Sequence, residues 1–335
     1  MNSAPPLKVG AARRLDRRRL IDLLGENGFI VIFILWCVYL AFAADAFLTS
    51  RNIFTVLRQA SIVSIVAIGE MLVMLMGALD ISLAAILGFS GVLTAGLMTQ
   101  SNAPPALAGA IGIGIGGIIG LINGFLVTKV KINAVIATLG MLNVLNGIAF
   151  IYAQGQTIYG PQLQSIAFLA RGSLGPLPLI GEVPVPVALM FIFYAVFYFI
   201  LNRTVYGAQI YALGNNEKAA WLAGIRVDRV KILAFMLAGL LAGFGGVMQA
   251  SRQGSATGGM GDEFLFPILT AVILGGISLS GGKGRVQNTL IASIFLVTIT
   301  NGMVLLGTSI YAQRIVSGAI LIGALSLDRL RVRAR

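Results

Sequence analysis

The sequence has no histidine, one cysteine and few charged residues. Charged side chains make up 11% of its 335 residues, whereas apolar side chains make up 57%. Soluble domains carry about 25% charged residues, which cover the surface that water contacts. This chain has too few charges for such a surface, so a soluble enzyme is close to excluded and a polytopic membrane protein is expected.

The missing residues also exclude several kinds of chemistry. Without histidine the chain cannot form an imidazole-ligated zinc site, a Ser-His-Asp triad or a Cys-His dyad. The single cysteine, Cys37, excludes an intrachain disulfide and any cysteine cluster. We therefore predict that the protein is not an enzyme and that it has no catalytic residues, metal ligands or cofactor.

Long apolar stretches occupy most of the chain instead. A spanning helix needs about 20 apolar residues, and this criterion predicts an all-α polytopic membrane bundle of about ten transmembrane helices. The first stretch follows a basic segment, as in a signal peptide, but we interpret it as an uncleaved span because nothing soluble follows it. The expected spans are 28–44, 59–77, 82–100, 106–127, 134–152, 184–201, 230–250, 264–280, 287–306 and 311–327.

The basic residues predict the orientation of these spans. The formal net charge is +12, and ten spans with both termini in the cytoplasm place nineteen of the 24 Lys and Arg residues on the inner side. We therefore expect a basic cytoplasmic segment 1–27, a transmembrane domain 28–327 and a basic cytoplasmic tail 328–335. The excess charge then reflects orientation and attraction to anionic lipid, and no nucleic-acid partner is expected. The outer side keeps Arg51, Arg58, Arg171, Arg252 and Arg314.

The segments outside the membrane are short. The longest outer segments are 153–183 and 251–263, and the main inner loop is 202–229. None of them is a soluble domain of 50 residues or more. Any energy source or soluble receptor must therefore belong to another chain, unless an ion gradient drives the protein.

Several polar residues lie within or between the expected spans. Charged groups in a membrane usually face a cavity or pair internally, because burying them in hydrocarbon is costly. The carboxylates and amides therefore predict either a hydrated translocation path or structural contacts between helices. Asp80 has a further alternative, as a cap of the helix that follows it. The candidate path residues are Glu70, Asp80, Ser82, Asn143, Asn146 and Asn301.

One span carries glycines at a strict spacing of four residues. Gly112, Gly116, Gly120 and Gly124 would form a smooth stripe on one helix face. Such stripes allow another helix to approach closely within a membrane. We interpret this stripe as a helix-packing surface, and a dinucleotide site is not expected because no strand precedes it.

The inner loop contains a predicted short helix within residues 211–225. Gly214 or Asn215 can cap its start, Glu217 suits the N-terminal dipole, and Gly224 can end it. The small residues Ala219, Ala220 and Ala223 would cover one side of it. This pattern suits insertion into a groove on a partner protein, or a helix lying on the membrane with Trp221 at the headgroups.

Four blocks of this sequence resemble ABC-transporter permeases of the ribose/xylose/arabinose class. They cover most of residues 50–330 in the family's order, and together they are more specific than any one of them. The blocks are Ala67–Ser82, Lys131–Gly140, Gly214–Ile225 and Leu274–Gly284.

The resemblance implies a permease subunit of a sugar importer in the bacterial inner membrane. Its expected partners are a cytoplasmic ATPase, a periplasmic sugar-binding protein, a second permease chain, lipid and the sugar itself. The chief alternative is a proton-coupled secondary transporter that uses Glu70 or Asp80. By resemblance, the residues that contact the ATPase are Gly214, Asn216, Glu217, Ala219, Ala220, Gly224 and Ile225.

Overall fold

Every apolar stretch identified in the sequence contains a helix in the computed structural model, which describes residues 28–177 and 181–333. Within this described part, six helices are long and apolar enough to cross a membrane: α2 (Ser50–Leu75), α4 (Pro105–Thr128), α5 (Ala134–Tyr152), α7 (Val185–Arg203), α10 (Val227–Gln253) and α12 (Val286–Leu305). The other helices in these stretches are Gly28–Ala43, α3 (Leu83–Thr99), α11 (Leu265–Leu274) and α13 (Ile310–Arg333). The segment 1–27 lies outside the described residues, and the tail 328–335 continues α13 as far as Arg333.

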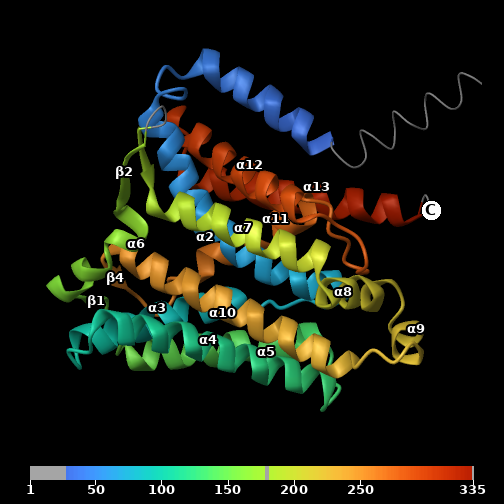
Figure 1. Ribbon diagram of the computed structural model, residues 1–335. Coiled ribbons are helices and arrows are strands. Elements are labelled where there is room, and N and C mark those ends of the chain that lie inside the picture. The colour runs from blue at the N-terminus through green and yellow to red at the C-terminus, as the bar shows by residue number, and fades with distance from the viewer. Residues whose placement is uncertain (1–27, 178–180, 334–335) are drawn as a thin grey trace, which may run out of the picture.

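Shorter elements gather at the two ends of the bundle. Figure 1 shows α8 and α9 at one end, and β1, β4 and α6 at the other. The pairing of β1 with β4 is antiparallel and joins the segments 153–183 and 251–263, while β2 pairs with β3. These short strands were not expected in an all-α chain. Their bounds, with the neighbouring short helices, are β1 (Ile158–Tyr159), η1 (Pro161–Ile166), α6 (Phe168–Arg171), β2 (Ser173–Leu177), β3 (Gly181–Pro184), α8 (Val205–Asn215), α9 (Glu217–Leu222), β4 (Ser255–Ala256) and η2 (Asp262–Phe264).

The eighth predicted span, 264–280, is wrong as a single helix. Helix α11 has 10 residues, which at about 1.5 Å per residue reach about half of a hydrocarbon core of about 30 Å. After Leu274 the chain continues as the glycine-rich loop 275–285, where Gly276, Gly281 and Gly282 have positive φ angles. Irregular backbone at membrane depth is tolerated where protein encloses it, and five residues of this loop are buried: Gly275, Ile277, Ser278, Gly281 and Gly282.

The core of the protein is built around α2. Every residue from Ala60 to Leu75 is buried, as expected for a helix that is apolar on all sides. Figure 1 shows α2 in the middle of the bundle, with α11, α12 and α13 on one side and α3, α4 and α5 on the other. Helix α10 packs against α2, α3 and α4, and so joins α2 to the group of α3, α4 and α5.

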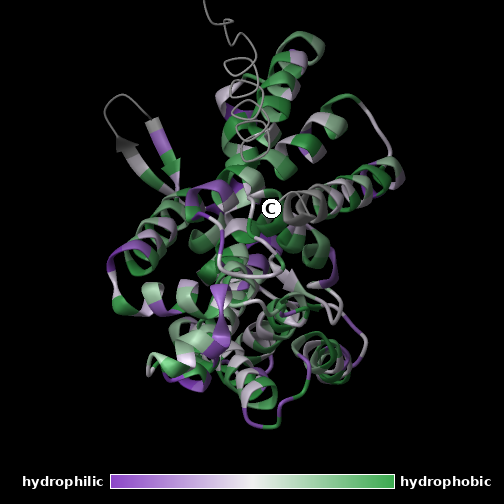
Figure 2. Cartoon of the chain, turned by 90° about the vertical axis from the view of Figure 1, so that its right-hand side faces the viewer, coloured by the Kyte–Doolittle hydropathy of each residue, from purple (hydrophilic) through white to green (hydrophobic). Residues whose placement is uncertain are grey.

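The outer helices expose large apolar side chains. Phe42 is 88% exposed and Ile151 is 79% exposed, and similar residues cover α4, α5 and α7. Hydrophobic colour covers most of the helical ribbon in Figure 2, whereas hydrophilic colour lies largely in connecting segments and at helix ends. Apolar surface on this scale is unfavourable in water, and it suits contact with lipid.

The glycine stripe of α4 lies against α10. A Cβ atom on Gly120 would collide with the carbonyl oxygen of Phe235, and one on Gly116 would collide with that of Gly239. At Gly124 it would lie 2.8 Å from the Cα atom of Ile232. The fourth glycine, Gly112, instead makes room for Thr94 of α3. The stripe therefore allows three helix backbones to approach closely.

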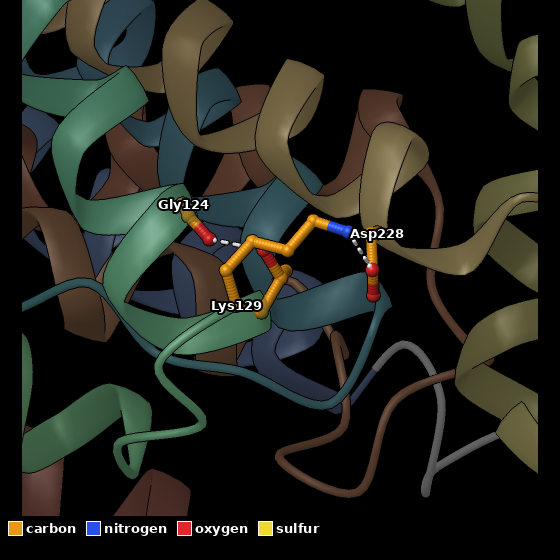
Figure 3. A network of polar contacts seen from close by, with 4 residues as sticks. Gly124, Lys129 and Asp228 are labelled. Atoms are coloured by element: carbon orange, nitrogen blue, oxygen red, sulfur yellow. Dashed lines mark hydrogen bonds and ion pairs between the residues drawn. The ribbon is translucent and has the colours of Figure 1, made fainter.

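An ion pair joins the ends of the same two helices. The Nζ atom of Lys129, which follows α4, lies 2.6 Å from Oδ2 of Asp228 in the first turn of α10 (Figure 3). Both side chains are largely exposed, and exposed pairs contribute little to stability. The glycine contact is therefore the main attachment between α4 and α10.

We expect Gly120→Val to weaken this attachment, because no space exists for the added atoms. Overpacking of this kind costs about 1–3 kcal/mol. The matched control is Gly114→Val on the same helix, since a Cβ atom there meets nothing within 4 Å, and its effect should stay within about 0.5 kcal/mol. Unfolding midpoints in detergent, followed by circular dichroism, measure both. Equal losses in the two variants would contradict the packing role.

Candidate functional site

The short helix α9 begins one or two residues later than the cap prediction required. Asn216 is its N-cap, and its side-chain Oδ1 accepts a hydrogen bond of 2.9 Å from the backbone N–H of Ala219. The predicted caps, Gly214 and Asn215, are wrong because both residues belong to the last turn of α8. Glu217 lies in the first turn of α9 as predicted, and its Oε2 atom pairs with Nζ of Lys231 at 2.7 Å.

Gly224 ends α9, as predicted. Its φ angle is +84°, a conformation that glycine adopts without strain. The N–H of Gly224 donates to the carbonyl of Trp221, and the N–H of Ile225 donates to that of Ala220. These two bonds form a Schellman motif, which fixes the direction in which the chain enters α10.

The exposed face of α9 differs from the predicted one. Ala219 and Ala223 are exposed, but Ala220 is only 5% exposed and packs into the core. Ala220 therefore supports the helix from inside and cannot present its side chain to a partner. The exposed side carries Trp221 and Leu222 instead, which are 65% and 70% exposed.

Helix α8 connects this segment to the interior of the bundle. A Cβ atom on Gly214 would collide with the carbonyl oxygen of Leu75 at the end of α2 and with the N–H of Gly282. The N–H of Gly282 donates to the same Leu75 carbonyl at 2.8 Å, and the hydroxyl of Tyr211 donates to the carbonyl of Gly284 at 3.0 Å. Gly214 thus lies at a junction of α8, α2 and the glycine-rich loop, and not on the surface of α9.

A buried polar cluster lies where α2 turns into α3. The Oδ1 atom of Asp80 accepts bonds from the N–H and the hydroxyl of Ser82, at 2.9 and 2.6 Å. The N–H of Asp80 donates to Oε1 of Glu70 at 3.3 Å. The side-chain amide of Asn123 on α4 donates to Ser82 at 2.8 Å and to Asp80 at 3.4 Å. The hydroxyl of Thr138 on α5 accepts a hydrogen bond from the backbone N–H of Ile81.

This cluster is enclosed and incompletely paired. Glu70, Asp80, Ser82 and Asn123 are each at most 1% exposed. Within the described part of the chain, Oε2 of Glu70 and Oδ1 of Asn123 have no hydrogen-bond partner. Asp80 precedes the N-cap Ser82 and holds its N–H, so it supports the helix start without being the cap. Asn123 is not among the residues predicted from the sequence, although any polar residue within a span is a candidate for function.

The other predicted path residues lie elsewhere. Asn143 and Asn146 are on α5, where Asn143 donates to Leu139 of its own helix and Asn146 donates to Asp262 at 3.1 Å. Asn301 of α12 exchanges two amide bonds with Asn52 of α2, at 2.9 and 3.1 Å. The six predicted residues therefore do not form one site.

Comparisons with known proteins agree along most of the chain. The family described as branched-chain amino acid transport system / permease component matches residues 52–325. The ribose import permease protein of Bacillus subtilis (strain 168) is 38% identical over 90% of this chain and 91% of its own length. The L-arabinose ABC transporter permease protein of Azospirillum brasilense is 33% identical over 99% and 95%, respectively. The D-allose transport system permease protein of Escherichia coli (strain K12) is 33% identical over 90% of each chain. No solved structure matches the chain.

The amide pair between α2 and α12 can be tested with a double-mutant cycle. We expect Asn52→Ala and Asn301→Ala to be non-additive, with a coupling of about 0.6 kcal/mol, the average for hydrogen bonds between membrane helices. The control cycle combines Asn52→Ala with Asn143→Ala, whose amide bonds to its own helix, and should be additive. The free energy of unfolding in detergent is the measurement, and additivity in both cycles would contradict a bonded pair.

Proposed function

Because the chain belongs to the branched-chain amino acid transport system / permease component family, we propose that it is the membrane-spanning permease subunit of an ATP-binding-cassette importer. The solute that we propose is a monosaccharide or a related polyol. The observation that carries this conclusion is the identity of 33–38% to permeases named for ribose, L-arabinose and D-allose, over at least 90% of the chain. On this proposal the solute crosses unchanged, and the protein performs no chemistry of its own.

We propose that the helices cross the bacterial inner membrane with both termini in the cytoplasm. Figure 1 shows α8 and α9 at one end of the bundle. Lys231 pairs there with Glu217 of α9, Lys129 pairs with Asp228 in the first turn of α10, and Lys283 follows a glycine that contacts α8. The opposite end carries β1, β4 and α6. A concentration of basic residues at one end is the pattern of a cytoplasmic face. In this arrangement α11 and the loop 275–285 together take the place of one span.

Helix α9 is the proposed contact with the cytoplasmic ATPase. Trp221 and Leu222 expose an apolar surface at the end of the bundle, and short helices of this kind insert into grooves on partner proteins. Movement of α9 would pass through α8 to the Gly214 junction, and from there to α2 and the glycine-rich loop. Asn216, Glu217, Gly224 and the half-buried Ile225 fix the shape of the helix that makes this contact.

We place the solute path beside α5. Only 17% of the apolar window of α5 is buried, and its exposed face includes Asn143. An amide facing lipid is unfavourable, so this face suits a second permease chain and a hydrated path between the two. The Glu70 cluster is enclosed, and we assign it to holding α2, α3 and α4 together. The periplasmic binding protein would dock on the opposite end from α9.

The energy source separates the proposal from its chief rival. The permease, the ATPase and the binding protein, taken from neighbouring genes and reconstituted in proteoliposomes, should take up sugar only when ATP is hydrolysed. Sugar uptake should persist when an ionophore removes the proton gradient. Uptake by the Glu70→Gln variant should likewise not depend on the gradient. Uptake that continues without ATP and stops with the ionophore would refute the importer and favour the secondary transporter.

Substitutions on the exposed face of α9 should uncouple the permease from the ATPase. We expect Leu222→Asp to lower sugar uptake about tenfold or more while the permease remains in the membrane, since a desolvated charge would face the partner groove. Trp221→Ala should act in the same direction. Phe191→Ala is the control, because it removes an exposed apolar side chain from the half of α7 that follows β3, away from the end that leads into α8. Normal copurification of the ATPase with Leu222→Asp would place the contact elsewhere.

A further inference from the structure

Three arginines from separate elements line one cavity at the end of the bundle opposite α9. Arg58 comes from α2, Arg171 from the end of α6 and Arg252 from the last turn of α10. The cavity has a volume of about 300 Å³, and Thr55 and Gln59 of α2 also line it. A cavity of this size accommodates a small ligand or a headgroup.

The charges in this cavity are largely uncompensated. Within the described residues, none of the three arginines forms a salt bridge, and the two ion pairs lie at the other end of the bundle. The Nε atom of Arg58 is buried without a hydrogen-bond partner. Glu263 interacts with Arg252, but its Oε1 atom also accepts a hydrogen bond from Gln249 at 3.1 Å. The carboxylate beside Arg252 is therefore shared with Gln249.

The backbone holds one of the arginines in place. Both Nε and one terminal nitrogen of Arg171 donate to the carbonyl of Ser251, at 3.2 and 3.1 Å. Gly254 leaves α10 in a left-handed conformation with φ +66°, and a Cβ atom there would lie 2.7 Å from the guanidinium of Arg171. This fixed geometry leaves the remaining donors of Arg171 available to a ligand.

The three arginines lie close together on the side of the membrane where basic residues are few. On the proposed topology the outer side has five basic residues, and three of them meet in this cavity. Outer segments usually avoid Lys and Arg, and grouped like charges repel one another. A bound anion would remove that repulsion. Because the donors come from three directions, they suit a tetrahedral dianion better than a planar carboxylate, which one arginine binds with two parallel bonds.

We propose that this cavity binds a phosphate-type oxyanion, held by Arg58, Arg171 and Arg252. Two sources have this chemistry. One is free inorganic phosphate or a phosphate ester, and the other is the headgroup of an anionic phospholipid on the outer side of the inner membrane. The site is distinct from the proposed sugar path beside α5 and from the ATPase contact on α9. It requires neither transport nor a particular sugar.

Binding to the full-length chain in maltoside detergent, which contains no phosphate, tests the proposal. One arm titrates inorganic phosphate by calorimetry, and the other titrates phosphatidylglycerol and counts retained lipid by native mass spectrometry. We expect Arg58→Gln and Arg252→Gln each to weaken binding about tenfold or more, because each removes charge-assisted bonds. Arg58→Lys should lie between, since it keeps the charge and loses the fork of donors.

The matched control is Arg51→Gln, which removes an outer arginine of α2 that does not line the cavity. The affinity of this variant for each probe should stay within about twofold of that of the parent chain. Unchanged unfolding midpoints exclude misfolding of the variants. If the chain binds inorganic phosphate, the ligand of the cavity is a free anion. If it binds phosphatidylglycerol alone, the ligand is a lipid headgroup. The proposal is overturned if the parent chain binds neither probe, if Arg51→Gln weakens binding as much as Arg58→Gln, or if the arginine variants lose only association with the binding protein.

Discussion

Close contact between the glycine faces of α4 and α10 is the interaction on which the other helices depend. Lipid is as apolar as a leucine side chain, so membrane helices gain little from burying apolar surface against each other and rely on van der Waals packing. The absence of side chains at Gly116, Gly120 and Gly239 brings two backbones together. Since α10 also packs against α2 and α3, its position determines where α2 and the polar cluster of Glu70 lie.

Hydropathy was sufficient to predict the helices, but not the connections that depend on tertiary contacts. All ten apolar stretches contain helices because backbone groups in hydrocarbon require internal hydrogen bonds. The eighth stretch passed the same test of composition, yet its helix stops before the Gly275-Gly276 pair and the chain continues as a partly buried loop. The pairing of Ile158 with Ala256 joins residues far apart in the sequence, and no local pattern indicates it.

The candidate site shows a similar division. The region of α9 and its end at Gly224 were predictable from capping chemistry, which acts over a few residues. The cap was displaced because Gly214, Asn215 and Asn216 are all suitable cap residues, and packing of α8 on the glycine-rich loop selects the last of them. The inward direction of Ala220 could not be predicted from a helix of 6 residues, since such a helix is too short to define an apolar face. Asn123 was missed because its partners, Asp80 and Ser82, lie in the turn between α2 and α3, about 40 positions earlier in the chain.

The burial of α2 has a consequence for how the protein is made. Its partners α10 and α12 are translated much later, and the Asn52–Asn301 pair spans 249 positions, which takes roughly 10–50 s at about 5–20 residues per second. During that interval the two helices that pack most extensively on α2 are absent. The N–H of Asp80, which donates to Glu70, follows only ten positions later, so this contact can form early in synthesis. Local polar contacts would thus protect the nascent chain until the distant helices arrive.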